Sequence, residues 1–526
     1  MRIIIILYSL LFVNGLFAQS SAWIGANPEN FVKHINQEDL KTHLFTLASS
    51  EMEGRETGKP GQKKAADYIS SVFKNYGLPA IGDQGTYFQK VTYRTENWEK
   101  ISLGINGETF RSVKDFYAIP YYNTNLDSFA TNEIVFLGYG IDDERYSDYE
   151  NADVKNKVIL IYDGEPIDKD GNSFVTGTSD TSDWTKNWKK KLQVAKAKGV
   201  KAVLFIDSDF QENLLKNAQQ SLSGYEVQFT DAQIEKEVAN SVFLSSTLAK
   251  KIVGNQFNSL VKARKKIIRK GKAESVSIAC DFGLQLRKNV RSLEGENVLG
   301  YIEGVDEQLK DELVVITAHY DHLGKRGESI YFGADDNASG TSTVLEICQA
   351  FQEAKKIGQG PRRSVLVMLV SGEEKGLLGS KFYAENPVFP IENTIANVNV
   401  DMVGRTDEKH AGNPDYIYVI GADRLSSELH QINENANTTH TQLELDYTYN
   451  LESDPNRYYY RSDHYNFAEK GVPAIFYFSG THTDYHRTSD TPEKIDLKKM
   501  EKIGKLVFYT SWGLANRDER IKVDKK

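Results

Sequence analysis

Short apolar runs rich in β-branched residues recur through the second half of the chain. Residues 311–318, 364–370, 395–400 and 473–478 each hold a nearly continuous apolar stretch, which is typical of strands buried on both faces of a sheet. Residues 341–351 instead carry apolar positions at helical spacing and predict an amphipathic helix. The pattern predicts an α/β fold with a mixed, mostly parallel sheet flanked by helices.

Acidic residues and histidines stand at the ends of these predicted strands. In open α/β sheets, ligands bind outside the carboxyl ends of the strands, so we expect these side chains to meet at one edge of one sheet. Both residue types are metal ligands. The candidate ligands, in chain order, are His319, Asp336, Glu374, Asp401 and His486.

Residues next to the candidate ligands indicate which side chains bind metal and which support them or act as a base. In His319-Tyr-Asp321, the imidazole is a ligand and the carboxylate fixes its orientation, or the two exchange roles. Asp335 and Asp336 are adjacent in a loop, where one can face a metal while the other braces the backbone. The pair Glu373-Glu374 divides naturally into a metal ligand and a general base.

The number of candidates bears on the number of metal ions. Two histidines and three carboxylates exceed the three protein ligands of one tetrahedral catalytic zinc. They suit two ions roughly 3.5 to 4 Å apart that share one bridging carboxylate. Zinc is the expected metal, and cobalt or manganese fits the same donors.

Five segments together resemble the motif set of the di-zinc exopeptidases of clan MH, which includes secreted bacterial aminopeptidases and glutamate carboxypeptidase. The resemblance is carried by their order, spacing and strand context. The segments are His319-Tyr-Asp321, Gly333-Ala-Asp-Asp-Asn-Ala-Ser-Gly340, Glu373-Glu-Lys-Gly-Leu-Leu-Gly-Ser380, Asn399-Val-Asp-Met402 and Tyr485-His-Arg-Thr-Ser-Asp-Thr491.

The resemblance implies a role for each matching residue. His319 and Asp401 would hold one Zn²⁺, Glu374 and His486 the other, and Asp336 would bridge both. Glu373 would be the general base and acid, and Asp321 the partner that orients His319. Tyr485 is similar to a tyrosine that steadies the tetrahedral intermediate in the carboxypeptidase branch. A cis peptide often follows the bridging aspartate of the family, here at Asp336-Asn337.

Other polar residues near the motifs receive plainer interpretations. His322 is expected beside the ligands or facing solvent, and His482 at the rim of the site, because the glycine and threonines around it indicate a loop. Ser462-Asp463-His464 resembles a pocket-lining turn of the family. A helix N-cap at Ser462 or Asp463 explains the same residues equally well.

The first residues predict export. Arg2 and the apolar run 3–13 have the form of a signal peptide, too short to span a bilayer, with a cleavage site after residue 18. The protein is therefore expected in the periplasm or secreted, with no membrane span in the mature chain. Cys280 and Cys348 lie in apolar stretches away from any histidine partner, and no disulfide framework is expected.

The chain predicts two units. By resemblance, residues 19–104 and 286–520 form a discontinuous di-zinc peptidase domain. Residues 105–285 form an inserted, β-rich α+β protease-associated domain, predicted from the strands 132–140, 154–162 and 202–206 and a helix that ends at Gly199. The net charge of −9 argues against a nucleic-acid partner, and the basic run 262–272 is expected to be a solvated helix face.

Three functions remain open at this point. The first is an exported zinc aminopeptidase that hydrolyses N-terminal residues from peptides. The second is a carboxypeptidase or dipeptidase on the same scaffold, for which Arg457 and Arg461 are candidate cations for the substrate's terminal carboxylate. The third is a non-catalytic, receptor-like binding protein, which the intact ligand set and Glu373 disfavour.

Overall fold

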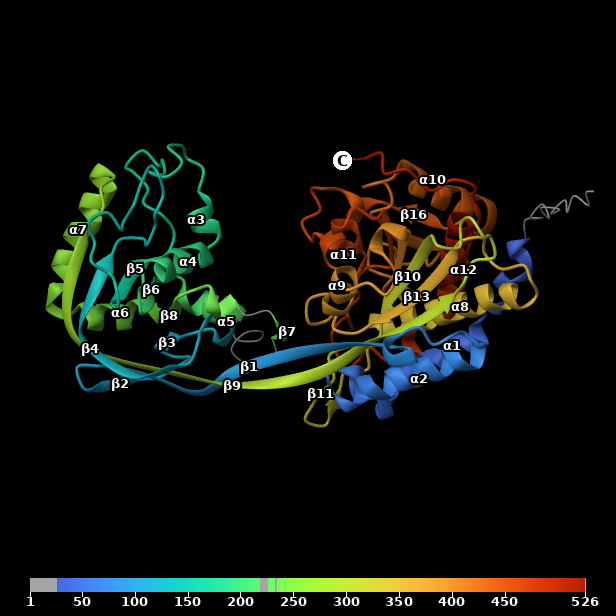
Figure 1. The fold of residues 1–526 in the computed structure, drawn as a ribbon, viewed down its shortest axis with the longest axis horizontal. Helices are drawn as coiled ribbons and strands as arrows, with labels where there is room; N and C mark the ends of the chain where they lie inside the picture. Colours follow the sequence, from blue (N-terminus) through green and yellow to red (C-terminus); the bar gives the residue numbers. More distant parts are fainter. Residues whose placement is uncertain (1–25, 218–225, 232–233, 526) are drawn as a thin grey trace, which may run out of the picture.

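The protein consists of two lobes joined by a long β-ribbon (Figure 1). A computed structural model describes residues 26–217, 226–231 and 234–525. The large lobe comprises residues 26–87 and 298–525, and the inserted lobe comprises the described residues between 103 and 286. The signal peptide predicted for residues 1–18 lies outside the described residues.

A mixed, mostly parallel sheet forms the centre of the large lobe. The pairs β10/β13, β10/β14, β14/β17 and β15/β16 are parallel, whereas β9/β13 and β15/β17 are antiparallel. The four strands predicted from apolar runs are all present, so the expected fold class is confirmed. In spatial order the strands are β16 (Glu444–Asp446), β15 (Tyr416–Ile420), β17 (Ala474–Phe478), β14 (Thr394–Val400), β10 (Leu313–His319), β13 (Ser364–Val370) and β9 (Ser275–Ile302).

Helices cover both faces of this sheet because alternate strand residues point in opposite directions. Val314 and Ile316 of β10 belong to the larger apolar core, whereas Leu313 and Val315 pack in a second core on the other face. The larger core includes side chains of α1 (Gln37–Leu47), α2 (Pro60–Tyr76), α8 (Gly340–Lys356), α10 (Ser427–Ala436) and α12 (Leu497–Asn516). The second includes α9 (Leu378–Glu385) and α11 (His464–Glu469).

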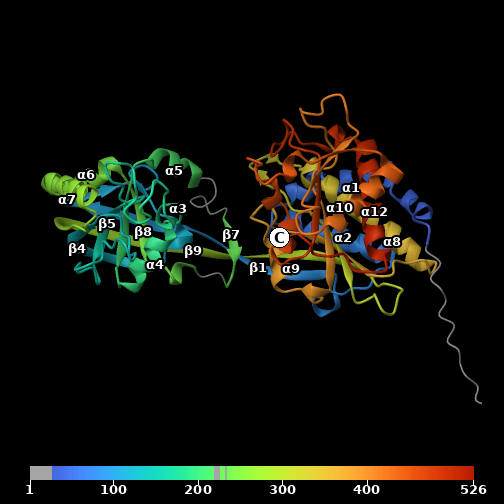
Figure 2. The ribbon, with the colours of Figure 1, turned by 90° about the horizontal axis from the view of Figure 1, so that it is seen from above.

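The ribbon is the antiparallel pair of β1 (Phe88–Ile105) and β9, and the view from above shows it crossing between the lobes (Figure 2). Its register shifts once, between Trp98 and Lys100. Two short strands also pair with β1, namely β2 (Glu108–Phe110) and β7 (Val227–Phe229).

The inserted lobe has its own sheet, which continues from the ribbon. β4 (Leu126–Leu137) pairs with β9, and β5 (Val158–Tyr162), β6 (Ala202–Asp207) and β8 (Asn240–Ser245) follow in parallel, with β3 (Phe116–Tyr117) antiparallel at the edge. One face packs against α6 (Ser246–Val253) and α7 (Phe257–Lys270). The other packs against α4 (Lys189–Ala197) and α5 (Phe210–Asn217). The short helix α3 (Asp183–Lys186) contributes Trp184 to the core on the first face.

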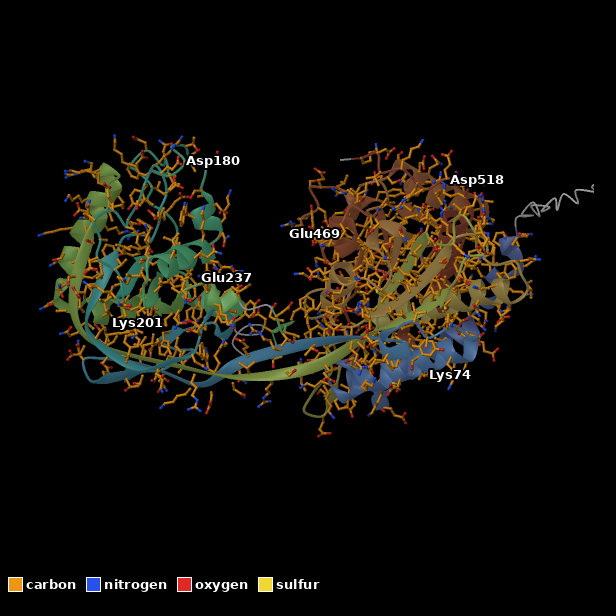
Figure 3. All side chains as sticks on the ribbon, viewed as in Figure 1. Lys74, Asp180, Lys201, Glu237, Glu469 and Asp518 are labelled. Carbon is orange, nitrogen blue, oxygen red and sulfur yellow. The ribbon has the colours of Figure 1, made fainter. Side chains whose placement is uncertain are left out.

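Each lobe therefore buries apolar side chains of its own, and sticks for all described side chains fill both bodies (Figure 3). The basic run lies on α7, whose buried residues are Leu260, Ala263 and Ile267, so its lysines and arginines form the outer helix face as expected. Cys280 and Cys348 are free, buried thiols. Among the described residues, no helix combines the length and apolar character that a membrane span requires.

Candidate metal centre

The strand ends bring the predicted ligands to one edge of the large-lobe sheet. His319 is the last residue of β10, and Asp401 directly follows β14. Glu373 and Glu374 follow β13 by a tight turn, and Asp336 lies in the segment that leads into α8. His486 comes from the loop after β17. All five candidates meet there because the carboxyl ends of parallel strands share one edge.

Asp336 lies at the centre of the site. Its Oδ1 atom is 3.3 Å from Nε2 of His319, and its Oδ2 atom is 3.0 Å from Nε2 of His486. The side chain is buried. Each oxygen of one carboxylate therefore faces a different imidazole, as required of a carboxylate between two cations.

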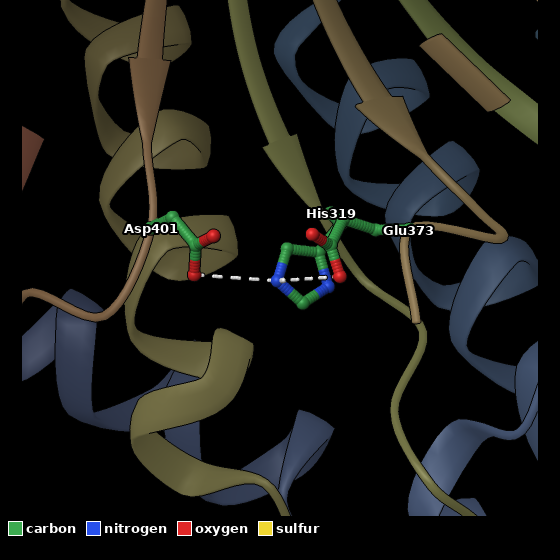
Figure 4. A group of neighbouring side chains, drawn as sticks. All are labelled: His319, Glu373 and Asp401. Carbon is green, nitrogen blue, oxygen red and sulfur yellow. Dashed lines mark hydrogen bonds and ion pairs between the residues drawn. The ribbon is translucent and has the colours of Figure 1, made fainter. Parts of the chain in front are cut away.

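The candidate metal-binding side chains form two groups, one of which includes Asp336. His319, Glu373 and Asp401 make up the first, with Nε2 of His319 3.3 Å from Oδ1 of Asp401 and 4.0 Å from Oε2 of Glu373 (Figure 4). The second consists of Asp336, Glu374 and His322. Within each group the candidate ligand atoms lie within 4.8 Å of one another, a spacing that suits a shared cation.

Two histidines contact Glu374. Nδ1 of His322 is 2.8 Å from Oε1 of Glu374, and Nε2 of His486 is 3.4 Å from Oε2. Of the two positions expected for His322, beside the ligands or facing solvent, the structure shows the first, because its side chain is completely buried against Glu374. Its position three residues after His319 is a signal in the sequence, although spacing along an irregular segment does not reveal the direction of a side chain.

The carboxylates around the imidazoles of His319 and His486 favour the protonated form of these rings. Burial opposes the charged form, but the carboxylates of Asp401 and Glu373 raise the pKa of His319 well above its usual value. Burial also lowers the pKa of His486, but the carboxylates of Asp336 and Glu374 outweigh this effect and raise it to about 10. The protons on these rings offset a cluster of carboxylates, and a divalent cation would replace them on binding.

The two adjacent glutamates have opposite electrostatic surroundings. Burial raises the pKa of Glu373 well above its usual value, and nearby Glu374 and Asp401 add to the rise. Burial acts on Glu374 in the same direction, but His322 and His486 lower its pKa to about 2. Groups of this kind with divergent pKa values are typical of acid–base sites. Imidazole nitrogens and carboxylate oxygens are also the donors that zinc takes, so these residues fit a metal.

Asp321 links His319 to Glu373. Nδ1 of His319 is 3.2 Å from the carbonyl oxygen of Asp321 and 3.7 Å from its carboxylate. That carboxylate also accepts hydrogen bonds from the hydroxyl of Thr57 and the backbone N–H of Glu373. These contacts hold the ring with Nε2 directed toward Asp336 and Asp401.

Ser462 supports Asp401 from the opposite side. Its hydroxyl donates to Oδ2 of Asp401 at 2.8 Å and accepts from the amide of Asn399. Asp463 occupies the N-cap position of α11, which begins at His464, but its side chain makes no capping hydrogen bond. Sequence reasoning identified this turn but not its contact with Asp401.

The backbone around Asp336 is held by hydrogen bonds to the carboxylates of Asp335 and Asp490. Asp335 braces the chain as expected, since its Oδ1 accepts from the N–H of Gly404, and the N–H groups of Asp335 and Asp336 donate to Asp490. His482 was expected at the rim, but its side chain is 4 % exposed and lies 3.3 Å from Asp335. The Asp336-Asn337 peptide is cis, which confirms the expectation from the family resemblance.

Arg55 is a buried support that sequence reasoning did not identify. Its guanidinium donates to the carbonyl oxygens of Tyr320, Phe332 and Gly333, in the segments that carry the first histidine and Asp336, and to that of Leu47. Burial lowers the pKa of Arg55 to about 10. The motif Glu53-Gly-Arg-Glu-Thr-Gly58 was the available signal, but its contacts cross more than 260 positions of the chain.

An aromatic pocket adjoins the site. Tyr485 lines it, and its ring is stacked on His486 with 3.8 Å between centroids. Burial raises the pKa of Tyr485, so its phenol keeps its proton and can donate a hydrogen bond. The other residues that line the pocket beside the metal-site side chains are Met402, Tyr458, Arg461, Phe476, Phe478 and Thr481.

Comparison with known proteins agrees with this site. Residues 297–511, which carry every candidate ligand, match the sequence model of the family described as Peptidase family M28. This part of the chain is therefore similar to that family, a family of clan MH. The predicted resemblance to clan MH is thereby confirmed.

Individual relatives are similar over part of their length. The chain is 30 % identical over 212 residues to the "Probable leucine aminopeptidase" of Arthroderma otae, with 39 % of this chain and 55 % of that protein covered. It is 26 % identical over 268 residues to "Aminopeptidase YwaD" of Bacillus subtilis, with 49 % and 53 % covered. The chain thus spans about half the length of these curated relatives.

One solved structure shares the fold over nearly the whole chain. The aminopeptidase from Aneurinibacillus sp. strain AM-1 superposes with a TM-score of 0.55 at 19 % sequence identity, covering 95 % of this chain and 98 % of that one. At this identity the likeness establishes the fold.

Proposed function

We propose that this protein is a zinc-dependent aminopeptidase that hydrolyses the N-terminal residue from peptides. The observation that carries the proposal is the central carboxylate of Asp336, which presents one oxygen to His319 and the other to His486. The M28 match over residues 297–511 and the aminopeptidase relatives support the same activity.

The donor set suits two zinc ions. His319 and Asp401 would hold one, Glu374 and His486 the other, and Asp336 would bridge them. His322 contacts Glu374 at 2.8 Å and is a competing candidate for the second ion. When bound, zinc would polarise the scissile carbonyl and lower the pKa of water at the site.

The protein side chains would move the protons. Glu373 would take a proton from the attacking water and return it to the leaving amine, the role of a general base and acid. The carboxylate of Asp321 accepts a hydrogen bond from the backbone N–H of Glu373 and so fixes the position of Glu373. Tyr485, whose phenol stays protonated, would donate a hydrogen bond to the developing oxyanion.

The two-lobe fold supports the expected division of the chain. Residues 19–104 and 286–520 would form the peptidase domain, and residues 105–285 a protease-associated domain without catalytic residues of its own. We further propose that the protein acts outside the cytoplasm, in the periplasm or after secretion, on peptide substrates. The apolar run at residues 3–13 is the observation behind this location.

A carboxypeptidase or dipeptidase on the same scaffold is the second candidate. The observation in its favour is Arg461, an arginine that lines the pocket beside the metal site. Both arginines are exposed, but Arg457, the other candidate from the sequence, does not line this pocket.

The deciding assay uses the purified, zinc-loaded protein with free-amine aminoacyl nitroanilides and N-blocked dipeptides side by side. We expect cleavage of the free-amine substrates alone. Glu373→Gln should reduce kcat by about a thousandfold while two zinc ions per chain are retained, because it removes the base and no ligand. Glu385→Gln, at the exposed end of α9, is the matched control.

Two results would contradict the assignment. Cleavage of the blocked dipeptides would move the protein to the carboxypeptidase class. Loss of zinc in Glu373→Gln would instead show that Glu373 is a metal ligand. This alternative has a structural basis, because Glu373 belongs to one candidate metal-binding group with His319 and Asp401.

A further inference from the structure

Arg461 differs from the other residues around the aromatic pocket in its charge. The described residues that line the pocket include three carboxylates and two histidines of the metal site, and Arg461 is the only lysine or arginine among them. None of the described acidic residues forms an ion pair with its guanidinium. A permanent cation without a carboxylate partner thus borders the place where the substrate must lie.

The guanidinium is held in place by an aromatic ring. Its central carbon lies 4.8 Å from the centroid of Tyr458, a buried residue that also lines the pocket. Stacking on an aromatic face orients the planar group and leaves its N–H donors free at the edge. Arg461 and the phenol of Tyr485 line the same pocket, so the guanidinium lies beside the metal site.

Arg457 provides an internal comparison. Its guanidinium lies 4.7 Å from the centroid of Tyr460, so it makes the same kind of stacking contact four residues away. It does not line the pocket. Both arginines therefore stack on a tyrosine, and Arg461 is distinguished by its position beside the metal site.

We propose that Arg461 binds a carboxylate of the substrate, so that the enzyme favours peptides with a negative charge within a residue of the scissile bond. A guanidinium pairs with a carboxylate through two parallel N–H donors, whereas the apolar walls formed by Phe476 and Phe478 offer such a group no partner. The inference rests on the proposed peptidase function. The carboxylate belongs either to the side chain of an N-terminal Glu or Asp or to the C-terminus of a dipeptide.

The test compares neutral and charged substrates of equal shape. For the wild type, Arg461→Gln, Arg461→Lys and Arg457→Gln, we would measure the ratio of kcat/KM for glutamyl over glutaminyl nitroanilide, and for Leu-Gly over Leu-Gly amide. One of these ratios should fall about fivefold in Arg461→Gln, with partial recovery in Arg461→Lys, and stay at the wild-type value in Arg457→Gln. A fall in the first identifies a side-chain carboxylate, and a fall in the second a terminal one.

Charge reversal provides a second variant. Arg461→Glu should reverse the charge preference. The ratio of kcat/KM for lysyl over glutaminyl nitroanilide should be higher in this variant than in the wild type. If neither ratio changes in Arg461→Gln and Arg461→Glu while both variants keep the wild-type melting temperature, the inference is overturned and the peptidase function stands.

Failure of the proposed function has a different signature. If the zinc-loaded wild type cleaves none of the substrates, calorimetric binding of L-glutamate against L-glutamine, and of Leu-Gly against Leu-Gly amide, decides the question. Tighter binding of the charged member of either pair, lost in Arg461→Gln and kept in Arg457→Gln, supports carboxylate recognition without peptidase activity. Equal affinities within both pairs overturn it.

Discussion

At the residue scale, the site depends on side chains that hold the candidate ligands as much as on the ligands themselves. Asp401 receives a hydrogen bond from Ser462, and His319 is oriented by Asp321. Such partners fix the direction of a ligand and raise its basicity. Because they reach the site from separate segments, a defect in one of them should weaken metal binding without unfolding the lobe.

Ser462→Ala tests this argument. The change removes the donor to Oδ2 of Asp401 and leaves the fold of α11 alone, because Ser462 does not cap that helix. We expect the dissociation constant for zinc to rise about 10- to 100-fold. Competition with a chromophoric chelator measures it.

Ser489→Ala is the control, because its hydroxyl bonds to Asp484 and touches none of the candidate ligands. An unchanged zinc affinity in Ser462→Ala would show that Asp401 needs no support or is not a ligand.

At the element scale, the β7 region connects the inserted lobe to the ribbon and the large lobe. β7 pairs with β1, and the ring of Phe229 lies 5.9 Å from that of Phe382 in the large lobe. Near it, Arg94 of β1 forms a two-pronged ion pair with Glu235, at 3.2 and 2.9 Å. Both side chains are about one-tenth exposed, so this pair is shielded from water and salt.

Arg94→Ala should lower the free energy of unfolding by about 3 kcal/mol, because it removes both close contacts to the buried carboxylate of Glu235 and leaves it only Lys288, at 3.9 Å. The ribbon offers a matched control in Arg287, which pairs with Glu99 at 2.9 Å but is 64 % exposed. Arg287→Ala should cost less than about 1 kcal/mol. Urea titration of both variants gives the comparison, and equal costs would show that burial of the Arg94 pair does not matter.

At the scale of the whole molecule, separate apolar cores predict separate responses to metal. The candidate ligands all lie in the large lobe, whereas the inserted lobe packs around its own side chains. A ligand that binds only the folded state stabilises the unit that contains its site. Zinc should therefore act on one lobe and leave the other unchanged.

Scanning calorimetry with zinc and with a chelator tests this expectation. We expect two unfolding transitions, and zinc should raise the midpoint temperature of the large-lobe transition only. At a zinc concentration a hundredfold above the dissociation constant, the large lobe should be stabilised by about 2.7 kcal/mol. Asp336→Asn should abolish the shift, because the central carboxylate is lost. A single transition that moves as a whole would show that the ribbon couples the lobes into one unfolding unit.

The sequence by itself determined the sheet of the large lobe and nominated the candidate ligands at its edge. Apolar runs predict β10, β13, β14 and β17 because a strand buried on both faces has no polar positions. Acidic residues and histidines directly after such strands must lie near one another when the strands are parallel. Local pattern was therefore enough to nominate the candidate ligands.

Only the tertiary structure decided which nearby residues act with them. It buried His322 against Glu374, turned His482 toward Asp335 and placed Arg461, but not Arg457, at the pocket. These outcomes depend on contacts between segments far apart in the chain, and on the direction of side chains in irregular loops. Neither has a period that the sequence can display, so both were settled only by packing.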